Sequence, residues 1–275
     1  MTPLILHPTT SVLIEQLVAQ LPSSLLLSGD SGVGLLTIAR HLASNRVATI
    51  LQPLDAKQTV DDQTGTISVD AIRQLYDTTR SKQTHRQVII IDDGDRMSHA
   101  AQNAFLKLLE EPGRHVHFIM TTHQPDGLLP TVMSRLQHKH LRPITTEQSN
   151  DFIASFASKD ATKQRQLLFM AEGLPAEITR LAQNDDYFRT RAQSMADARQ
   201  ALQGDRYQKL LTALKHTQNR AEALQLLDSM TAIARRSLSQ KPQAQLVTQL
   251  ALIADIRDKI NAGGSVRLQL ARIVL

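Results

Sequence analysis

The N-terminal half of the chain alternates short apolar segments with helical patterns, and this alternation limits the folds open to it. Short apolar runs predict strands at residues 25–27, 47–51, 88–92, 116–121 and 139–141. Helical patterns lie between them; the clearest covers residues 100–111, with Ser98 as a cap and Pro112 at its end. Strands that alternate with helices predict an α/β fold with a five-stranded parallel sheet covered on both faces.

The C-terminal half reads as helical throughout. Thr145 and Gln148 have the spacing of a capping box, which predicts the start of a helix. Gly173 ends the next helical pattern, and Pro175 suits the first position of a new helix. Beyond it the chain reads as four or five helices, interrupted at Gly204, Pro242 and Gly263–Gly264. We therefore predict three domains: α/β over residues 1–143, a small helical domain over 144–184 and an all-α domain over 185–275.

Composition narrows the classes of function. The chain has no cysteine, which excludes disulfides and thiolate metal sites. We expect neither a signal peptide nor a membrane span, and hence a cytoplasmic protein without a membrane partner. Lysine and arginine number 13 against 13 acidic residues up to Pro143, but 18 against 13 beyond it. This surplus fits an acidic or nucleic-acid partner of the second half, although solvated helix faces account for it about as well.

A glycine-rich turn follows the first predicted strand, in the sequence LLLSGDSGVGLLTIAR of residues 25–40. Gly29 and Gly34 have the spacing of the phosphate-binding motif G-x-x-x-x-G-K-[ST], with Gly32 between them. Leu35 and Leu36, however, replace the lysine that reaches the phosphates and the hydroxyl that holds magnesium. We expect the two leucines to pack rather than to bind, and the backbone N–H groups of the turn to retain at most weak anion affinity.

An acidic pair follows the third predicted strand, in VIIIDDGD at residues 88–95. In proteins that hydrolyse nucleotides, an Asp at the end of such a strand holds magnesium and a following Glu polarises water. Here the pair is Asp92 and Asp93. Many strands end in Asp, but the position about 60 residues after a glycine turn makes this pair a candidate part of a nucleotide site.

Residues 91–137 resemble a block typical of the bacterial DNA polymerase III clamp-loader subunits, which are AAA+ proteins. NAFLKLLEEP at 103–112 is similar to their NALLKxLEEP helix, and LLPTVMSRL at 128–136 matches their LLPTIxSRC element except that Leu136 replaces the cysteine. The resemblance covers roughly residues 20–182. It implies an AAA+ module with a helical lid, followed by an all-α collar for assembly, and Thr121 or Thr122 as a polar sensor.

Within this family the chain is similar to the delta-prime type, which commonly has a degraded glycine loop. Motor subunits carry an arginine about three residues after the glycine of the lid, where this chain has Ala176. The chain also lacks the four-cysteine zinc module, so no zinc is expected. The lost lysine and hydroxyl remove charged hydrogen bonds of roughly 1.5–3 kcal/mol each, and we therefore expect no tightly bound nucleotide and no intrinsic catalysis.

The resemblance assigns the key role to Ser134 and Arg135. Arg135 would act as an arginine finger in trans, reaching the γ-phosphate of ATP held by a neighbouring gamma/tau-type motor subunit. The chain would be a non-hydrolysing stator that assembles with motor and delta-type subunits and loads the sliding clamp onto primed DNA. The vestigial nucleotide site would comprise a set of strand-end and turn residues: Gly29, Gly32, Gly34, Thr37, Asp92, Asp93 and Thr121.

Three alternatives stay open on the sequence. The chain could be an active ATPase in which Lys57 or Lys107 replaces the missing lysine, or a scaffold in which Arg135 is idle. The alternating histidines His115 and His117, and likewise His138 and His140, could bind a metal from one strand face, but without a carboxylate at ligand spacing we favour histidines that face water.

Overall fold

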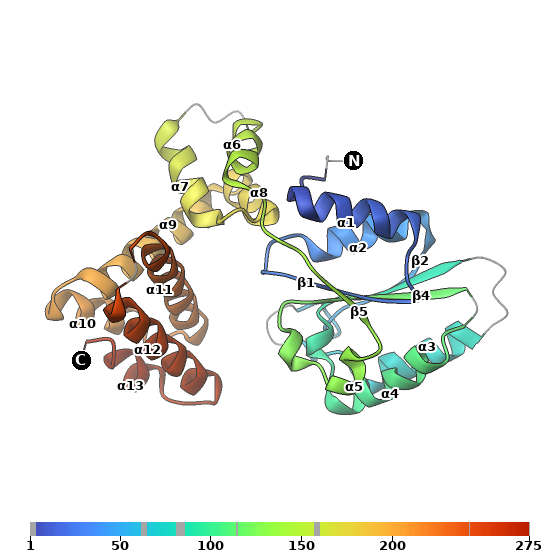
Figure 1. Cartoon of the computed structure of the whole chain (residues 1–275). Helices are drawn as coiled ribbons and strands as arrows, with labels where there is room; N and C mark the ends of the chain where they lie inside the picture. Colours follow the sequence, from blue (N-terminus) through green and yellow to red (C-terminus); the bar gives the residue numbers. More distant parts are fainter. Residues whose placement is uncertain are drawn as a thin grey trace. The chain divides into compact units, whose positions relative to one another are not determined.

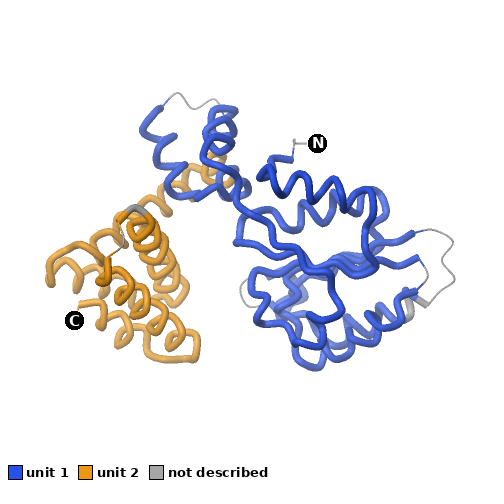
Figure 2. Tube along the Cα trace, in the orientation of Figure 1, with its two compact units in different colours: residues 1–179 blue, residues 180–275 orange. Residues whose placement is uncertain are grey.

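The structure is a computed structural model that describes residues 4–61, 65–80, 86–113, 115–156, 160–241 and 243–274. The chain divides into two compact units, residues 1–179 and 180–275 (Figure 2). The first unit combines the predicted α/β domain with most of the predicted small helical domain, and the division falls within helix α8 (Pro175–Gln183). The three-domain division with its boundaries at 143 and 184 stays a prediction.

Five parallel strands form the sheet of the first unit, which confirms the predicted fold class. They run in the spatial order β2-β3-β4-β1-β5. Their bounds are β1 (Ser24–Ser28), β2 (Val47–Leu51), β3 (Gln87–Ile91), β4 (Val116–Thr122) and β5 (Gln137–His140). The last strand begins two residues before its predicted start at 139 and ends at His140 instead of residue 141.

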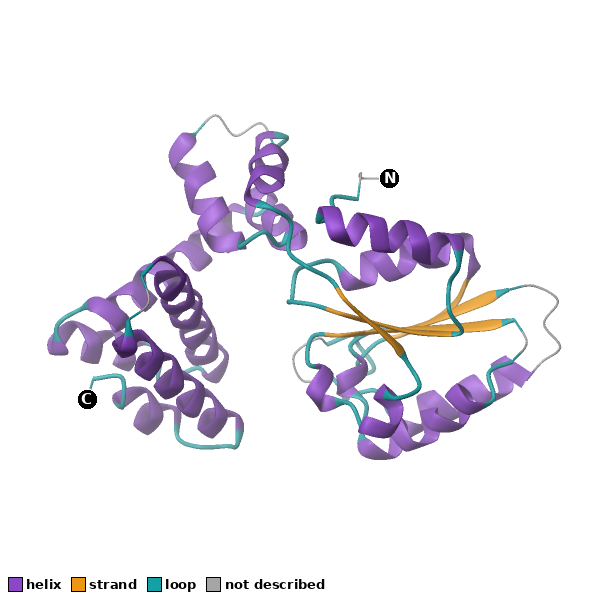
Figure 3. Ribbon diagram, viewed as in Figure 1, coloured by secondary structure: helices purple, strands orange, loops and turns teal. Residues whose placement is uncertain are grey.

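Helices cover both faces of this sheet (Figures 1 and 3). One face carries α1 (Pro8–Ala19) and α2 (Leu35–Ala43); the other carries α3 (Val69–Arg80), α4 (His99–Glu110) and α5 (Pro130–Met133). Successive side chains of β1 point to opposite faces of the sheet. Leu25 and Leu27 pack in the cluster beneath α1 and α2, and Leu26 packs in the same cluster as Phe105 of α4. Because these strands are buried on both faces, their sequences are almost continuously apolar.

Helix α1 was not predicted. It begins at Pro8, a residue suited to a first helical position, and the side chain of His7 accepts a hydrogen bond from the backbone N–H of Thr9. Ile14 and Leu17 are buried against the sheet. The expectation for the start of the chain concerned only a signal peptide, so this helix was missed.

Three further helices follow the sheet: α6 (Thr146–Ala154), α7 (Ala161–Ala171) and α8. The predicted capping box is confirmed, because the Thr145 hydroxyl accepts from the N–H of Gln148 and the Gln148 side chain accepts from the N–H of Thr145. Helix α8 begins at Pro175, as predicted.

The second unit contains α9 (Asp185–Gln203), α10 (Arg206–Lys215), α11 (Arg220–Gln240), α12 (Ala244–Asn261) and α13 (Val266–Ala271). Helix α11 packs against both α9 and α12, and α10 packs against α9 and α13. Its apolar core includes Met195, Leu226, Leu227, Ile253 and Ile256. The predicted helix breaks at Gly204 and at Gly263–Gly264 are confirmed, and Pro242 lies outside the described residues.

Candidate functional site

The glycine-rich turn between β1 and α2 needs each of its three glycines for steric reasons. Gly32 and Gly34 have φ angles of 95° and 94°, in the left-handed region that side chains rarely adopt. A Cβ atom on Gly29 would lie 2.9 Å from Cγ1 of Val33 and 3.0 Å from the carbonyl oxygen of Leu141. The glycines are therefore required by the path of the backbone, whether or not the turn holds a phosphate.

The two leucines after the turn pack, as expected. Leu35 is the first residue of α2 and is buried in the cluster beneath α1 and α2, and Leu36 packs against the same cluster. Thr37 is exposed in the first turn of α2 and has no hydrogen bond to the other predicted site residues that the structure describes. At the lysine position of the motif, the chain therefore has an apolar side chain pointing into the core.

The acidic end of β3 is tied to the neighbouring strand. Oδ1 of Asp92 accepts a hydrogen bond from the Thr121 hydroxyl at 2.7 Å, and Oδ2 accepts from the Gln52 amide at 3.1 Å. The Thr121 hydroxyl oxygen in turn accepts from the backbone N–H of Asp93 at 3.0 Å. The sequence-predicted residues Asp92, Asp93 and Thr121 thus lie together at the carboxyl ends of β3 and β4. Thr122, the other sensor candidate, donates to Oδ1 of Asp95 at 2.5 Å.

His123 joins this acidic end to the glycine turn, and the sequence analysis did not single it out. Its Nδ1 lies 2.7 Å from the carbonyl oxygen of Gly29, so Nδ1–H donates there. Its Nε2 lies 3.8 Å from Oδ1 of Asp93. The strand order explains the bridge, because β4 lies between β3 and β1 and the residue after β4 reaches both neighbours. The only signal in the sequence was its place directly after the fourth strand.

The start of α8 packs on the same turn. The backbone N–H of Ala176 donates to the carbonyl oxygen of Gly32 at 3.0 Å. A Cβ atom on Gly32 would lie 3.4 Å from Cβ of Leu174 and 3.5 Å from Cβ of Glu177. The glycine turn is therefore held by contacts within the chain: His123 on one side and the N-terminal end of α8 on the other.

Arg135 lies just after α5 on an exposed part of the sheet unit. Its Nη2 is 2.8 Å from Oε1 of Glu110, the last residue of α4, and its Nη1 donates to the carbonyl oxygen of Thr131 at 3.0 Å. The side chains of Arg135 and Glu110 are 38% and 53% exposed. Ser134 also donates to the carbonyl oxygen of Thr131, at 3.0 Å. The guanidinium is oriented by its own chain yet open to solvent.

Gln102 connects α4 to the loop that precedes Arg135. Its side chain is buried, with Nε2 donating to the carbonyl oxygens of Met97 and Gly127 at 3.3 and 3.1 Å. Its Oε1 accepts from the backbone N–H of Leu129, the cap of α5, at 2.7 Å. One buried amide therefore satisfies three backbone groups and sets the start of the element that carries Arg135.

We predict that Gln102→Ala releases this loop. The change leaves one backbone N–H and two carbonyls without their partner, at a cost of about 2–3 kcal/mol. Hydrogen exchange of the segment 124–136 should then accelerate by roughly 30-fold or more, since each 1.4 kcal/mol is a factor of ten. The control is Asn103→Ala, one position along the same helix, where the side chain is exposed. Equal exchange in the two variants would contradict the role of Gln102.

Three of the four paired histidines, His117, His138 and His140, make hydrogen bonds with residues distant in sequence. Nε2 of His138 and Nδ1 of His140 lie 2.7 and 3.1 Å from the hydroxyl oxygen of Ser28 on β1, so the pair shares one face of β5 as predicted. Nδ1 of His117 lies 2.8 Å from the carbonyl oxygen of Pro22. Burial lowers the pKa of both His117 and His138. His115, His138 and His140 are exposed and His117 is half-buried, so the expectation that these histidines face water is confirmed for three of the four, while neighbouring strands and loops also contact His117, His138 and His140.

No group of three or more His, Asp or Glu side chains in the part of the chain that the structure describes is arranged to hold a metal ion. No helix in the same part combines the length and the apolar character needed to cross a membrane.

The fold and the juxtaposed glycine turn and acidic strand end define an AAA+-type α/β module. A solved structure of a DNA polymerase III gamma subunit-related protein from Thermotoga maritima superimposes with a TM-score of 0.53 at 19% identity, over 95% of this chain and 97% of that one. Its likeness supports the fold, including the helical C-terminal part.

Sequence comparison finds similar proteins among the subunits of bacterial DNA polymerase III. The profile described as "DNA polymerase III, delta subunit" matches residues 51–145. The delta' subunit of Yersinia pestis is 30% identical over 202 residues, which are 68% of this chain and 59% of that protein. The gamma subunit of Buchnera aphidicola from Schizaphis graminum is 32% identical over 153 residues, 49% of this chain and 42% of the relative. The chain is thus similar to subunits of the bacterial DNA polymerase III clamp loader, and it spans about half the length of the curated relatives that it matches.

Proposed function

We propose that this chain is a non-hydrolysing, delta-prime-type subunit of the replicative clamp loader. The observation that carries the proposal is the contrast between two positions. Leu35, at the lysine position of the phosphate-binding motif, is buried in the apolar core, whereas Arg135 is exposed and oriented by Glu110. Such a chain has little means of holding a triphosphate itself but presents a cation to a neighbour.

The proposed partners are gamma/tau-type motor subunits and a delta-type subunit, and through them the sliding clamp and primed DNA. The resemblance to both delta' and gamma subunits supports this assignment. ATP would be bound by the neighbouring motor subunit, and this chain would need no tightly bound cofactor and no zinc. The role places its action in the cytoplasm, at the replisome on the nucleoid.

In this proposal Arg135 acts in trans. A guanidinium directed at the γ-phosphate of a neighbour's ATP stabilises charge that develops as the phosphoryl group departs. Glu110 and the carbonyl of Thr131 hold the guanidinium in one orientation before the neighbour binds, which reduces the conformational entropy lost on docking. The test is the clamp- and DNA-stimulated ATPase activity of the reconstituted complex with Arg135→Ala, developed in the Discussion.

We predict that the isolated chain binds ATP–Mg²⁺ at least about 100-fold more weakly than the motor subunit of the same organism. The missing lysine and hydroxyl account for roughly 3–6 kcal/mol of lost phosphate binding. Titration calorimetry on both proteins under one buffer condition measures the difference, with the motor subunit as the positive control. Binding as tight as that of the motor subunit would instead support the alternative of an active ATPase, with Lys57 or Lys107 as the substitute lysine.

A further inference from the structure

Two neighbouring threonines end β4, and their hydroxyls contact different parts of the chain. Thr121 and Thr122 are both fully buried. The Thr121 hydroxyl bonds with the acidic pair at the end of β3. The Thr122 hydroxyl instead donates to Oδ1 of Asp95 at 2.5 Å and accepts from the backbone N–H of Gln124 at 3.0 Å. Thr122 therefore joins the turn after β3 to the segment that leaves β4.

Asp95 contacts the same segment at a second point. It lies in the 3₁₀ turn Gly94–Arg96 after β3, and Gly127 lies in the 3₁₀ turn Pro125–Gly127 after β4. A Cβ atom on Gly127 would lie only 3.1 Å from Cβ of Asp95, so the two turns are in close contact. The Thr122 hydroxyl thus holds the start of the second turn, and Asp95 packs against its last residue.

This second turn leads directly to α5 and Arg135. The backbone N–H of Arg135 donates to the carbonyl oxygen of Val132 in α5 at 3.1 Å. Val132 is fully buried, so the position of Arg135 follows the position of α5. Gln102 holds the middle of the segment through its bonds to backbone groups. The start of the segment is held by the pair of Asp95 and Thr122.

We propose that Thr122 and Asp95 are positioning residues for Arg135, which fix the start of the arginine-bearing segment as Gln102 fixes its middle. The inference rests on the proposed function, because Arg135 acts in catalysis only if it meets the ATP of a neighbour. It also separates Thr122 from nucleotide sensing. The Thr122 hydroxyl has one proton and donates it to Asp95, so none is left for a phosphate oxygen.

The first experiment measures hydrogen exchange of the segment 124–136 in the full chain. Thr122→Val keeps the branched shape of the side chain but removes the hydroxyl. It should accelerate exchange in the segment by about tenfold or more, as expected for the loss of a buried hydrogen bond to a charged group. Thr122→Ser keeps the hydroxyl and should restore exchange close to the wild-type rate. The matched control, Thr121→Val, removes an equally buried hydroxyl and should leave this segment unchanged.

The second experiment measures the clamp- and DNA-stimulated ATPase activity of the reconstituted complex. Thr122→Val should lower kcat by about fivefold and leave KM for ATP unchanged, because a displaced guanidinium weakens only the transition state. A double variant with Arg135→Ala should be no slower than Arg135→Ala alone, since Thr122 acts through that arginine. Asp95→Ala removes the acceptor at a half-buried position and should reproduce both effects, which keeps the test decisive if Thr122→Val does not fold.

Four results would overturn the inference. Exchange in the segment 124–136 that stays unchanged in Thr122→Val, or that Thr121→Val accelerates equally, would remove the positioning role and leave the proposed function intact. Faster exchange with full ATPase activity would show that the pair holds the segment without placing Arg135. A double variant slower than Arg135→Ala alone would show that Thr122 acts by another route. An unchanged rate in Arg135→Ala itself would overturn the proposed function together with this inference.

Discussion

Arg135→Ala is expected to lower the clamp- and DNA-stimulated ATPase activity of the reconstituted clamp loader by at least tenfold, without loss of assembly. An arginine finger contributes roughly 10³–10⁵ to the rate at the site that it serves, because no other group replaces its charge in the transition state. The Arg135 side chain is 38% exposed and its partners Glu110 and Ser134 are exposed as well, so truncation should leave the fold of the sheet unit unchanged. Size-exclusion chromatography of the complex establishes assembly before the rates are compared.

Two control variants distinguish a role of Arg135 as an arginine finger from the loss of its ion pair and from the loss of any exposed arginine. Glu110→Ala breaks the same ion pair but keeps the guanidinium; because an exposed pair contributes about 0–1 kcal/mol, its rate should fall by less than about fivefold. Arg73→Ala removes an exposed arginine that also pairs with a single carboxylate, that of Asp70 on α3, and should leave the rate unchanged. If Arg135→Ala behaves like either control, Arg135 is idle and the chain is a scaffold.

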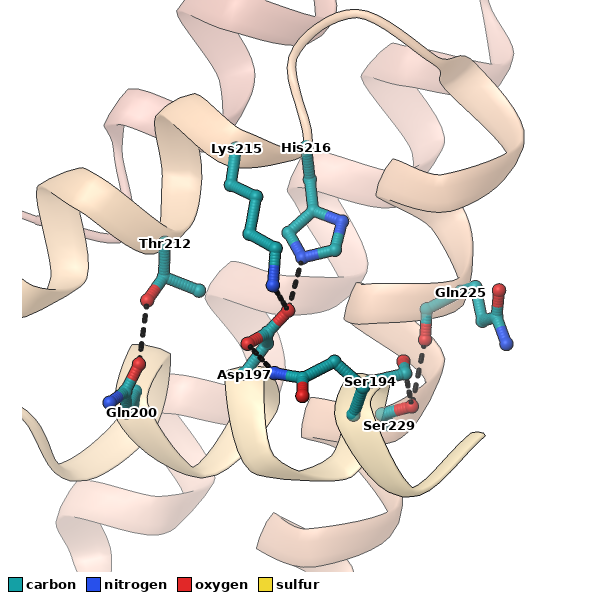
Figure 4. Close-up of polar contacts among 9 residues, drawn as sticks. Ser194, Asp197, Gln200, Thr212, Lys215, His216, Gln225 and Ser229 are labelled. Carbon is teal, nitrogen blue, oxygen red and sulfur yellow. Dashed lines mark hydrogen bonds and ion pairs between the residues drawn. The ribbon is translucent and has the colours of Figure 1, made fainter. Parts of the chain in front are cut away.

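Asp197→Ala is expected to destabilise the second unit by about 3 kcal/mol. Removal of one partner from a buried charged pair costs roughly 3–5 kcal/mol, and the value here falls at the lower end because Lys215 is 53% exposed and regains water. Lys215 and His216 meet the buried carboxylate of Asp197 on α9 (Figure 4), and Gln193 donates to it as well; these four residues are here called the Asp197 cluster. His216 and Gln193 lose their acceptor inside the unit. Amide exchange in the segment 206–216, measured by mass spectrometry on the whole chain, should accelerate by roughly 100-fold.

The control for this prediction is Asp186→Ala on the same helix. Asp186 is 91% exposed and pairs with Arg189 at 3.0 Å, so its loss should change exchange in the second unit by less than about fivefold. Equal effects of the two substitutions would show that the Asp197 cluster adds no more than a surface ion pair. Restored protection in a double variant that also replaces His216 with an apolar residue would indicate that the cost lies in the unpaired polar groups.

The elements of the fold that could be predicted are those encoded by residues close together in the sequence. The strand at residues 47–51 coincides with β2, and the capping box at Thr145 has both of its hydrogen bonds. Helix α1 was not predicted, although its sequence PTTSVLIEQLVA contains apolar residues at helical spacing, such as Ile14 and Leu17. The boundaries of β5 were misplaced by up to two residues because its sequence, QHKH, has no apolar pattern; its pairing with β1 defines it as a strand.

Part of the candidate site was predictable from the sequence, but its connections were not. Asp92 and Asp93 were predicted from their place at a strand end and Thr121 from the resemblance; the structure brings these three together, whereas Thr37 has no hydrogen bond to them. His123 was missed, because its role depends on the strand order that inserts β4 between β3 and β1. The contact of Ala176 with Gly32 likewise joins residues 144 positions apart (176 minus 32), which no local pattern encodes.

By itself the sequence determined the alternation of strands and helices, the loss of the lysine and hydroxyl after the glycine turn, and the presence of Arg135 in a family-specific element. These follow from periodicity and residue identity, which are properties of short segments. Only the tertiary structure decided that Glu110 orients Arg135 and that α10 turns its leucines outward. Periodicity identifies the apolar face of a helix, but which face is buried depends on the contacts made by segments distant in sequence, here the Asp197 cluster.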